Sequence, residues 1–216
     1  MPKSRSRRDN NLRRHIAYIA ARLMAEDGVA DYASAKNKAA RQAGLADLNL
    51  LPDNSEIEAA LREYQGLYQK DEQPAHLRHL REIAVKVMRD FEEFRPALVG
   101  SVLSGTAGQF SDVNLQLFTD DPKTLTMFLL NRRYRFEEGS KRMHLGDRFT
   151  EVPQVHFHVE DVPVTLTVLD RDDERMAPKA RADHEPQRAS LAEVEAMLGR
   201  LDDEFRATDP KEGRAQ

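Results

Sequence analysis

Two apolar segments, the first of which contains a Gly-Ser pair, most constrain how this chain can fold. The first, residues 97–103, is predicted to be a buried strand that contains the turn residues Gly100 and Ser101. The second, residues 113–119, alternates apolar and polar side chains, which is the period of a half-buried strand. Because side chains two positions apart on a strand share a face, Asp112 and Asn114 should point to the same side. The segment therefore predicts a sheet with a polar pair beside a tight turn.

The alternation continues, so the second half of the chain is predicted to be rich in strands. Gly139 is expected to form a turn, and the two-residue connection Glu160-Asp161 predicts a β-hairpin. Asp121-Pro122 marks the start of a helix, because proline favours the first helical turn. Further strands are expected at residues 134–137, 142–145, 154–159 and 162–169.

Residues 170–189 are charged, contain two prolines and show no periodicity. A loop of this length is uncommon inside a compact domain, so we predict a mobile flap or a linker. Ser190 and Glu193 then form a capping-box pair that begins a last helix. We expect the tail, residues 207–216, to be disordered.

The first hundred residues show helical spacing instead. Apolar residues recur at this spacing in four segments, which begin near residues 12, 34, 55 and 74. Gly28 and Gly44 end the first two segments. Ser55 and Glu58 are interpreted as a capping box at the start of the third.

Composition excludes several classes of site. The chain has 216 residues, 40% of them hydrophobic, and no cysteine, so disulfides, thiolate zinc sites and cysteine nucleophiles are ruled out. The net charge is −4, so bulk charge does not favour a polyanion as ligand. No apolar run approaches the roughly 20 residues that span a bilayer. We expect a soluble, cytoplasmic protein that does not enter a membrane.

The start of the chain is strongly basic, with six Lys or Arg residues against one Asp in residues 1–14. We expect residues 1–11 to form a disordered basic arm. Residues 13–45, two helical segments that end at Gly28 and Gly44, resemble the start of a TetR-type DNA-binding domain. This resemblance makes a DNA-binding regulator one alternative function. A small helical bundle is the simpler interpretation, and the strands downstream do not fit the all-helical ligand domain of that family.

The order of helix, strand, Gly-Ser turn, Asp-bearing strand, helix and further strands resembles the nucleotidyltransferase superfamily of DNA polymerase β. Its small bacterial members, the kanamycin-nucleotidyltransferase-like and antitoxin-like proteins, are closest in size. The family motif is an apolar residue and Gly-Ser, a spacer, then Asp, an apolar residue, Asp or Glu, and an apolar residue. Residues 99–101 (Val-Gly-Ser) and 112–115 (Asp-Val-Asn-Leu) match it with one departure. The resemblance covers residues 80–170.

The resemblance implies roles for individual residues. Gly100, Ser101 and Gly105 would contact a triphosphate, because glycine allows a close approach and the hydroxyl and turn amides can donate to phosphate oxygens. Asp112 would be the catalytic carboxylate, and Asp112 and Asn114 would bind Mg²⁺. In the family, three carboxylates hold two divalent cations that neutralise the attacking and leaving oxygens.

Two of those three carboxylates are replaced in this chain. Asn114 is an amide, and the strand expected to carry the third acid has Thr165 or Thr167 at that position. Asp161 and Asp170 flank that strand and would reach the site only if its register changed. Because Mg²⁺ needs hard anionic ligands, losing two charges should cost several kcal/mol of binding, so we expect Mg²⁺ to bind weakly.

Two further clusters stand out. His156 and His158 share one face of a predicted strand, which we interpret as a structural pair; a divalent site that joins Asp112 and one histidine is the weaker alternative. A basic cluster could contact the phosphates of a nucleotide or RNA, or simply pair with neighbouring glutamates. It consists of Arg132, Arg133, Arg135, Lys141 and Arg142.

We therefore predict an α+β protein, with an N-terminal helical segment at residues 12–72 packed on a nucleotidyltransferase-like mixed β-sheet with flanking helices at residues 73–206. The leading function is that of a divergent, catalytically impaired nucleotidyltransferase-like protein, a pseudoenzyme that binds a nucleotide, RNA or a protein partner. An active metal-dependent transferase, which moves a nucleoside monophosphate to a small molecule, protein or RNA, is the alternative.

Overall fold

The computed structural model describes residues 3–29, 31–44, 50–70, 72–145, 148–175 and 188–208, and the fold is α+β, as predicted. The chain divides into two compact units. One comprises Met1–Leu77 and Thr106–Ser111, and the other comprises Arg78–Gly105 and Asp112–Gln216. The division falls inside a helix, slightly after the boundary expected from the sequence. The short segment 106–111, which the sequence placed in the α/β part, belongs to the first unit.

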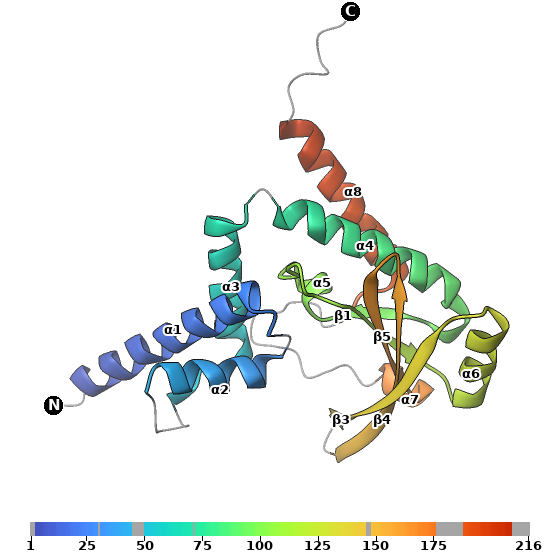
Figure 1. Cartoon of the computed structure of the whole chain (residues 1–216), viewed down its shortest axis with the longest axis horizontal. Helices are drawn as coiled ribbons and strands as arrows, with labels where there is room; N and C mark the ends of the chain where they lie inside the picture. The colour runs from blue at the N-terminus through green and yellow to red at the C-terminus, as the bar shows by residue number, and fades with distance from the viewer. Residues whose placement is uncertain are drawn as a thin grey trace, which may run out of the picture. The chain divides into compact units, whose positions relative to one another are not determined.

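The first unit is helical and contains α1 (Lys3–Glu26), α2 (Tyr32–Gln42), α3 (Asn54–Tyr68) and the start of α4 (Gln73–Asp90) (Figure 1). The segment expected to be a disordered arm forms the beginning of α1 from Lys3 onward, and no Gly or Pro interrupts this helix. Apolar faces of α1, α2 and α3 meet in one core. Its buried residues include Ile16, Ala20, Leu23, Ala35, Ala39 and Ile57.

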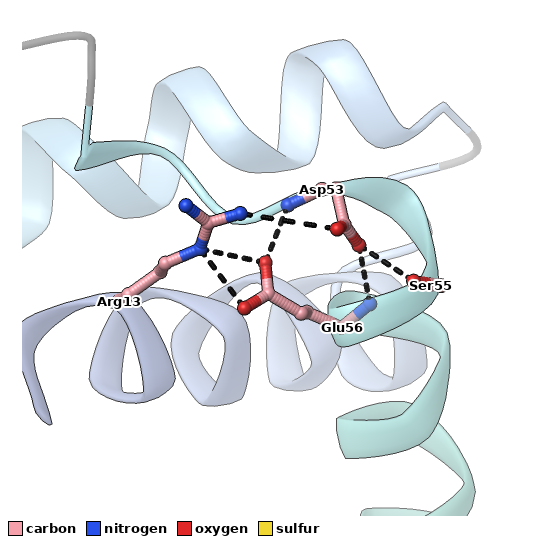
Figure 2. Close-up of polar contacts among 4 residues, drawn as sticks. All are labelled: Arg13, Asp53, Ser55 and Glu56. Atoms are coloured by element: carbon pink, nitrogen blue, oxygen red, sulfur yellow. Dashed lines mark hydrogen bonds and ion pairs between the residues drawn. The ribbon is translucent and has the colours of Figure 1, made fainter. Parts of the chain in front are cut away.

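The start of α3 differs from the prediction, because the capping box is formed by Asp53 and Glu56 rather than by Ser55 and Glu58. The Asp53 carboxylate accepts hydrogen bonds from Glu56 N at 2.8 Å and from Ser55 Oγ at 2.7 Å, and Glu56 Oε2 accepts from Asp53 N at 2.7 Å. Arg13 Nε of α1 donates to both Glu56 oxygens, at 2.9 and 2.8 Å (Figure 2). The cap therefore also holds α1 against α3.

The second unit contains a five-stranded mixed sheet in the order β1-β2-β5-β4-β3 (Figure 1). Only the central pair, β2 and β5, is parallel. The strands are β1 (Ala97–Val99), β2 (Val113–Phe118), β3 (Phe136–Leu145), β4 (Arg148–Val159) and β5 (Val162–Leu169). The helices are the rest of α4, α5 (Ser101–Ser104), α6 (Pro122–Asn131), α7 (Arg171–Arg175) and α8 (Leu191–Thr208).

One face of this sheet is apolar and packs on an aromatic cluster. Leu115 and Leu166, which are paired across β2 and β5, are fully buried. Phe91, which follows α4, stacks on Phe157 of β4 with ring centroids 5.9 Å apart and contacts Phe128 of α6 at 5.0 Å. Because the cluster covers this face, the polar residues at alternate positions of the strands lie on the other face.

Most predicted elements of this unit are confirmed. Glu160 and Asp161, with φ of 52° and 68°, form the hairpin turn between β4 and β5. Glu193 accepts a hydrogen bond from Ser190 N at 2.7 Å before α8. Gly139, however, lies inside β3, which is one continuous strand rather than two joined by a turn.

Part of the predicted loop and tail, residues 176–187 and 209–216, lies outside the described residues. Within the described part of the chain, no helix combines the length and the apolar character that a membrane span requires.

Candidate functional site

The strand predicted at residues 97–103 is wrong in length, because β1 ends at Val99 in a sharp turn at Gly100. This residue has φ 77° and ψ −154°, a backbone conformation that is essentially restricted to glycine. The one-turn helix α5 starts at Ser101, and Gly105 ends it with φ 83°. A Cβ atom on Gly100 would lie 3.8 Å from Asn114 Cβ, an ordinary contact. The backbone conformation, and not a lack of room, therefore requires glycine, and the turn lies directly beside Asn114.

Asp112 and Asn114 lie at the start of β2. Asn114 Nδ2 donates to the backbone oxygen of Asp112 at 3.2 Å, which fixes the orientation of the amide. Asp112 is partly buried, and this burial raises the pKa of its carboxyl. Positive charge on His156 and His158 of β4 acts in the opposite direction and lowers the pKa. The structure thus brings both histidines into electrostatic range of Asp112, although β5 lies between the strands.

The register of the sheet places Asn114 in a row of polar side chains. Asn114 pairs with Thr165 on β5, Thr165 with His156 on β4, and His156 with Glu137 on β3. Paired residues direct their side chains to the same face. His156 Nδ1 and Thr165 Oγ1 are hydrogen-bonded at 3.0 Å. The only carboxylate of this row, Glu137, is three strand spacings, about 14 Å, from Asn114.

A second row runs parallel to the first, one pleat further along. It contains Gln116, Thr167 and Gln154. Gln154 Nε2 donates to Thr167 Oγ1 at 3.1 Å, and Gln116 Oε1 accepts from Arg188 Nε at 2.6 Å. Burial lowers the pKa of the Arg188 guanidinium. We call the two rows together the polar sheet face: Asn114, Gln116, Gln154, His156, Thr165 and Thr167.

Gly139 of β3 lies next to the polar sheet face. A Cβ atom at this position would lie 3.1 Å from His156 Nε2, closer than a side chain can normally approach. The glycine therefore leaves the space that the imidazole occupies, and this explains why it is found inside a strand. Sequence reasoning assigned it to a turn, because glycine in a strand pattern is more often read as an interruption.

Sequence reasoning identified Asp112, Asn114 and the two histidines separately and missed the glutamines and Gly139. An every-second-residue pattern of polar side chains was visible on each strand: Asn-Leu-Gln, Gln-Val-His and Thr-Leu-Thr. That pattern predicts one polar face per strand. It does not reveal which residues of different strands are neighbours, because register depends on pairing across the sheet.

The fit of these residues to a metal can be judged from their chemistry. Thr165 stands beside Asn114, while Asp161 and Asp170 lie at opposite ends of β5 and are exposed. Among the described residues, no group of three or more His, Asp or Glu side chains could hold a metal ion. Asp112 is thus a lone carboxylate next to an amide and a hydroxyl that is already hydrogen-bonded. A two-cation site does not fit these ligands.

Comparisons with known proteins add little. No family model and no curated protein matches the chain. One solved chain, from the structure of the GLD-2/RNP-8 complex, is 23% identical with a TM-score of 0.27, and the match covers 45% of this chain and 41% of that chain. A likeness at this level carries no argument about the class of the protein.

Proposed function

We propose that this protein is a nucleotidyltransferase-like protein that binds a nucleotide or RNA on the polar sheet face and does not carry out two-cation transfer. One observation carries the proposal: Asn114 and Thr165, neutral residues, are paired on the two central parallel strands. The sequence resemblance implies carboxylates at the position of Asn114 and at that of either Thr165 or Thr167. The same scaffold therefore presents hydrogen-bonding groups where a catalytic member would present negative charge.

The composition of the polar sheet face supports binding. Amide and imidazole groups can donate to and accept from bases, sugars and phosphates without needing a metal to balance charge. The Thr165 and Thr167 side chains are buried and support these groups through hydrogen bonds. The β1 turn at Gly100 lies beside Asn114, so a ligand on this face meets backbone as well as side chains. Asp112 is the one acid beside Asn114, and positive charge on His156 and His158 partly offsets the negative charge of its carboxylate.

Two-cation catalysis requires more negative charge from carboxylates than this site offers. Mg²⁺ loses hydration reluctantly and is held by carboxylates together with substrate phosphates. With Asp112 as the single carboxylate, any Mg²⁺ at Asp112 and Asn114 would depend on phosphates of a bound nucleotide for most of its charge. Weak binding of Mg²⁺ and no measurable transfer are therefore the expected behaviour of the wild-type protein.

The test combines binding and turnover on the full chain. Isothermal titration with each of the four NTPs and with a short single-stranded RNA, each with and without Mn²⁺, should detect binding of at least one. Thr165→Val, which keeps the side-chain shape but removes the hydroxyl and frees His156, should weaken that binding. Thr126→Val, on the exposed surface of α6, should leave it unchanged and serves as the matched control.

Turnover is followed with α-labelled NTPs and the total protein and RNA of a cell extract as acceptors. Wild type and Asp112→Ala should both remain at background. Transfer above background that Asp112→Ala abolishes would establish the active transferase instead. Absence of binding to every nucleotide and RNA would eliminate the proposal.

Salt-dependent binding of duplex DNA would distinguish a DNA-binding regulator from both the nucleotide-binding protein and the active transferase. That binding should be lost on deleting residues 1–8, a truncation that leaves the Arg13–Glu56 contact intact.

A further inference from the structure

A pocket of about 530 Å³ lies where α6 ends and β3 begins. It is lined by Arg132, Arg133, Tyr134, Arg135 and His158. No acidic residue is among these, although the protein as a whole carries more acids than bases. Three arginines therefore line one cavity of a size suited to a nucleotide or a short piece of a nucleic-acid strand.

Among the described residues, the arginines of the pocket have no acidic partner, in contrast to several other arginines. Arg89 pairs with Glu195 at 2.6 Å and Arg95 with Glu174 at 2.9 Å. In the described part of the chain, no ion pair is found for Arg132, Arg133 or Arg135. Their charge is therefore available to a ligand.

Contacts around the pocket hold two of its side chains in place. The Arg132 guanidinium lies over the Phe128 ring, 5.1 Å from its centroid. The Tyr134 hydroxyl donates to Asp90 Oδ2 at 3.1 Å, which holds the tyrosine in place. Burial, followed by the charge of Asp90, raises the pKa of Tyr134 to about 12, so the hydroxyl stays a donor. Part of the lining is thus arranged before any ligand arrives.

Arg133 occupies a backbone position that favours glycine. Its N–H donates to the Leu130 oxygen and the N–H of Tyr134 to the Leu129 oxygen, both at 3.0 Å, which is the Schellman pattern at the end of α6. Arg133 has φ 59°, in the left-handed region where glycine is the usual residue. An arginine in this strained conformation indicates that its side chain, and not its backbone, is what the position needs.

Two residues of the pocket, Arg135 and His158, continue the polar sheet face, whereas Arg132 and Tyr134 contact the aromatic cluster on the other face. Phe136 pairs with Phe157, so one residue further along the same register Arg135 lies beside His158. His158 pairs with Pro163 on β5, and the same continuation places Asp112 on the other side of Pro163. Arg135, His158 and Asp112 thus form a third row next to that of Asn114. Arg135 is three strand spacings, about 14 Å, from Asp112.

We propose that this arginine pocket is a phosphate-binding subsite, which takes phosphate groups of a nucleotide or of a nucleic-acid strand that lies across the polar sheet face. A guanidinium binds phosphate through two parallel N–H donors, and this matches the chemistry of the lining. The inference rests on the proposed function only where it says that the remainder of the ligand lies on the polar sheet face. Phosphate binding by the pocket itself does not depend on that function.

The experiment uses the full chain and two probes, inorganic triphosphate and a short single-stranded RNA, at several salt concentrations. Arg133→Gly and Arg135→Ser should each weaken binding of the RNA about tenfold and reduce its salt dependence. Arg95→Gly makes the same change of charge at another left-handed position, φ 49°, where Arg95 pairs with Glu174 and lies outside the basic cluster. It is the matched control and should leave binding unchanged.

Arg133→Gly also separates loss of binding from loss of folding. Glycine relieves the left-handed backbone, so the variant should melt no lower than wild type while it binds less. Equal effects of Arg133→Gly and Arg95→Gly would overturn the inference, because they would show that binding depends only on the net charge of the protein.

The two probes identify the source of the phosphate and separate the two proposals. Binding of triphosphate that Arg133→Gly weakens and Thr165→Val leaves intact would support the pocket even if the sheet face binds nothing. RNA binding that is sensitive to Thr165→Val but not to Arg133→Gly would preserve the proposed function and refute the pocket.

Discussion

Asn114→Asp introduces a carboxylate at a position where the sequence resemblance implies an acid, and it tests the charge argument directly. The new carboxylate would stand two residues from Asp112 on the same face, about 6.6 Å away along the strand. Two unit charges at that separation repel each other by about 2.5 kcal/mol at an effective dielectric constant near 20, and by about 0.6 kcal/mol in bulk water. The substitution also removes the hydrogen bond from Asn114 Nδ2 to the Asp112 oxygen, worth about 1 kcal/mol.

The expected loss in free energy of unfolding is therefore about 1.5 to 3.5 kcal/mol at neutral pH in EDTA. Urea denaturation measures it, with Asn114→Ala as the control that loses the hydrogen bond without gaining charge. A divalent cation between the two carboxylates should reverse the loss, by about 2.7 kcal/mol when Mn²⁺ is present at a hundredfold excess over its dissociation constant. Wild type and Asn114→Ala should show no such response.

Two results would refute this reasoning. If Mn²⁺ stabilises wild type as much as Asn114→Asp, the site already holds a cation and is not short of charge. If Asn114→Asp is no less stable than Asn114→Ala in EDTA, the two side chains do not share a face. Label transfer is not expected from the single variant, because Thr165 still occupies the third position.

Three further predictions concern stability and the polar face. Asp53→Ala should cost about 1 kcal/mol in urea unfolding and Asp53→Asn less than half of that, since asparagine also caps a helix. The hydrogen bond from Ser55 is the main cause that lowers the pKa of Asp53, so the stability that depends on its charge is present above about pH 4 and is lost as the pH falls through the folded-state pKa. Gly139→Ala should shift the imidazole NMR signals of His156 and change unfolding by less than about 1 kcal/mol, because the added methyl displaces the ring by a few tenths of an ångström. Phe91→Ala, a fully buried residue in the aromatic cluster, should cost about 3–5 kcal/mol in the same unfolding assay, and a loss below 1 kcal/mol would contradict the packing described.

Local signals in the sequence were sufficient for most elements. Helical spacing located α1 to α4, and Glu160-Asp161 located the β4–β5 hairpin, because both depend on residues close together in the chain. The capping error at α3 shows the limit of such signals. Asp53 and Glu56 have the same spacing as Ser55 and Glu58, and the additional contact with Arg13 of α1 is not a local feature.

The candidate site was predictable only in part. Alternation placed Asp112 and Asn114 on one face, and His156 and His158 on another strand, from sequence alone. The polar row formed with Thr165 depends on the register of β2, β5 and β4, three strands that are far apart in the chain.

The sequence by itself determined the residue types: a turn that only glycine can form at Gly100, and an amide where the family motif has a second acid. The tertiary structure decided their neighbours. Parallel pairing of β2 with β5 set Thr165 beside Asn114, and the β3–β4 pairing extended the polar face toward the arginines that follow α6. The physical reason is that side-chain direction alternates locally along a strand, whereas register is set by hydrogen bonds and burial across the whole sheet.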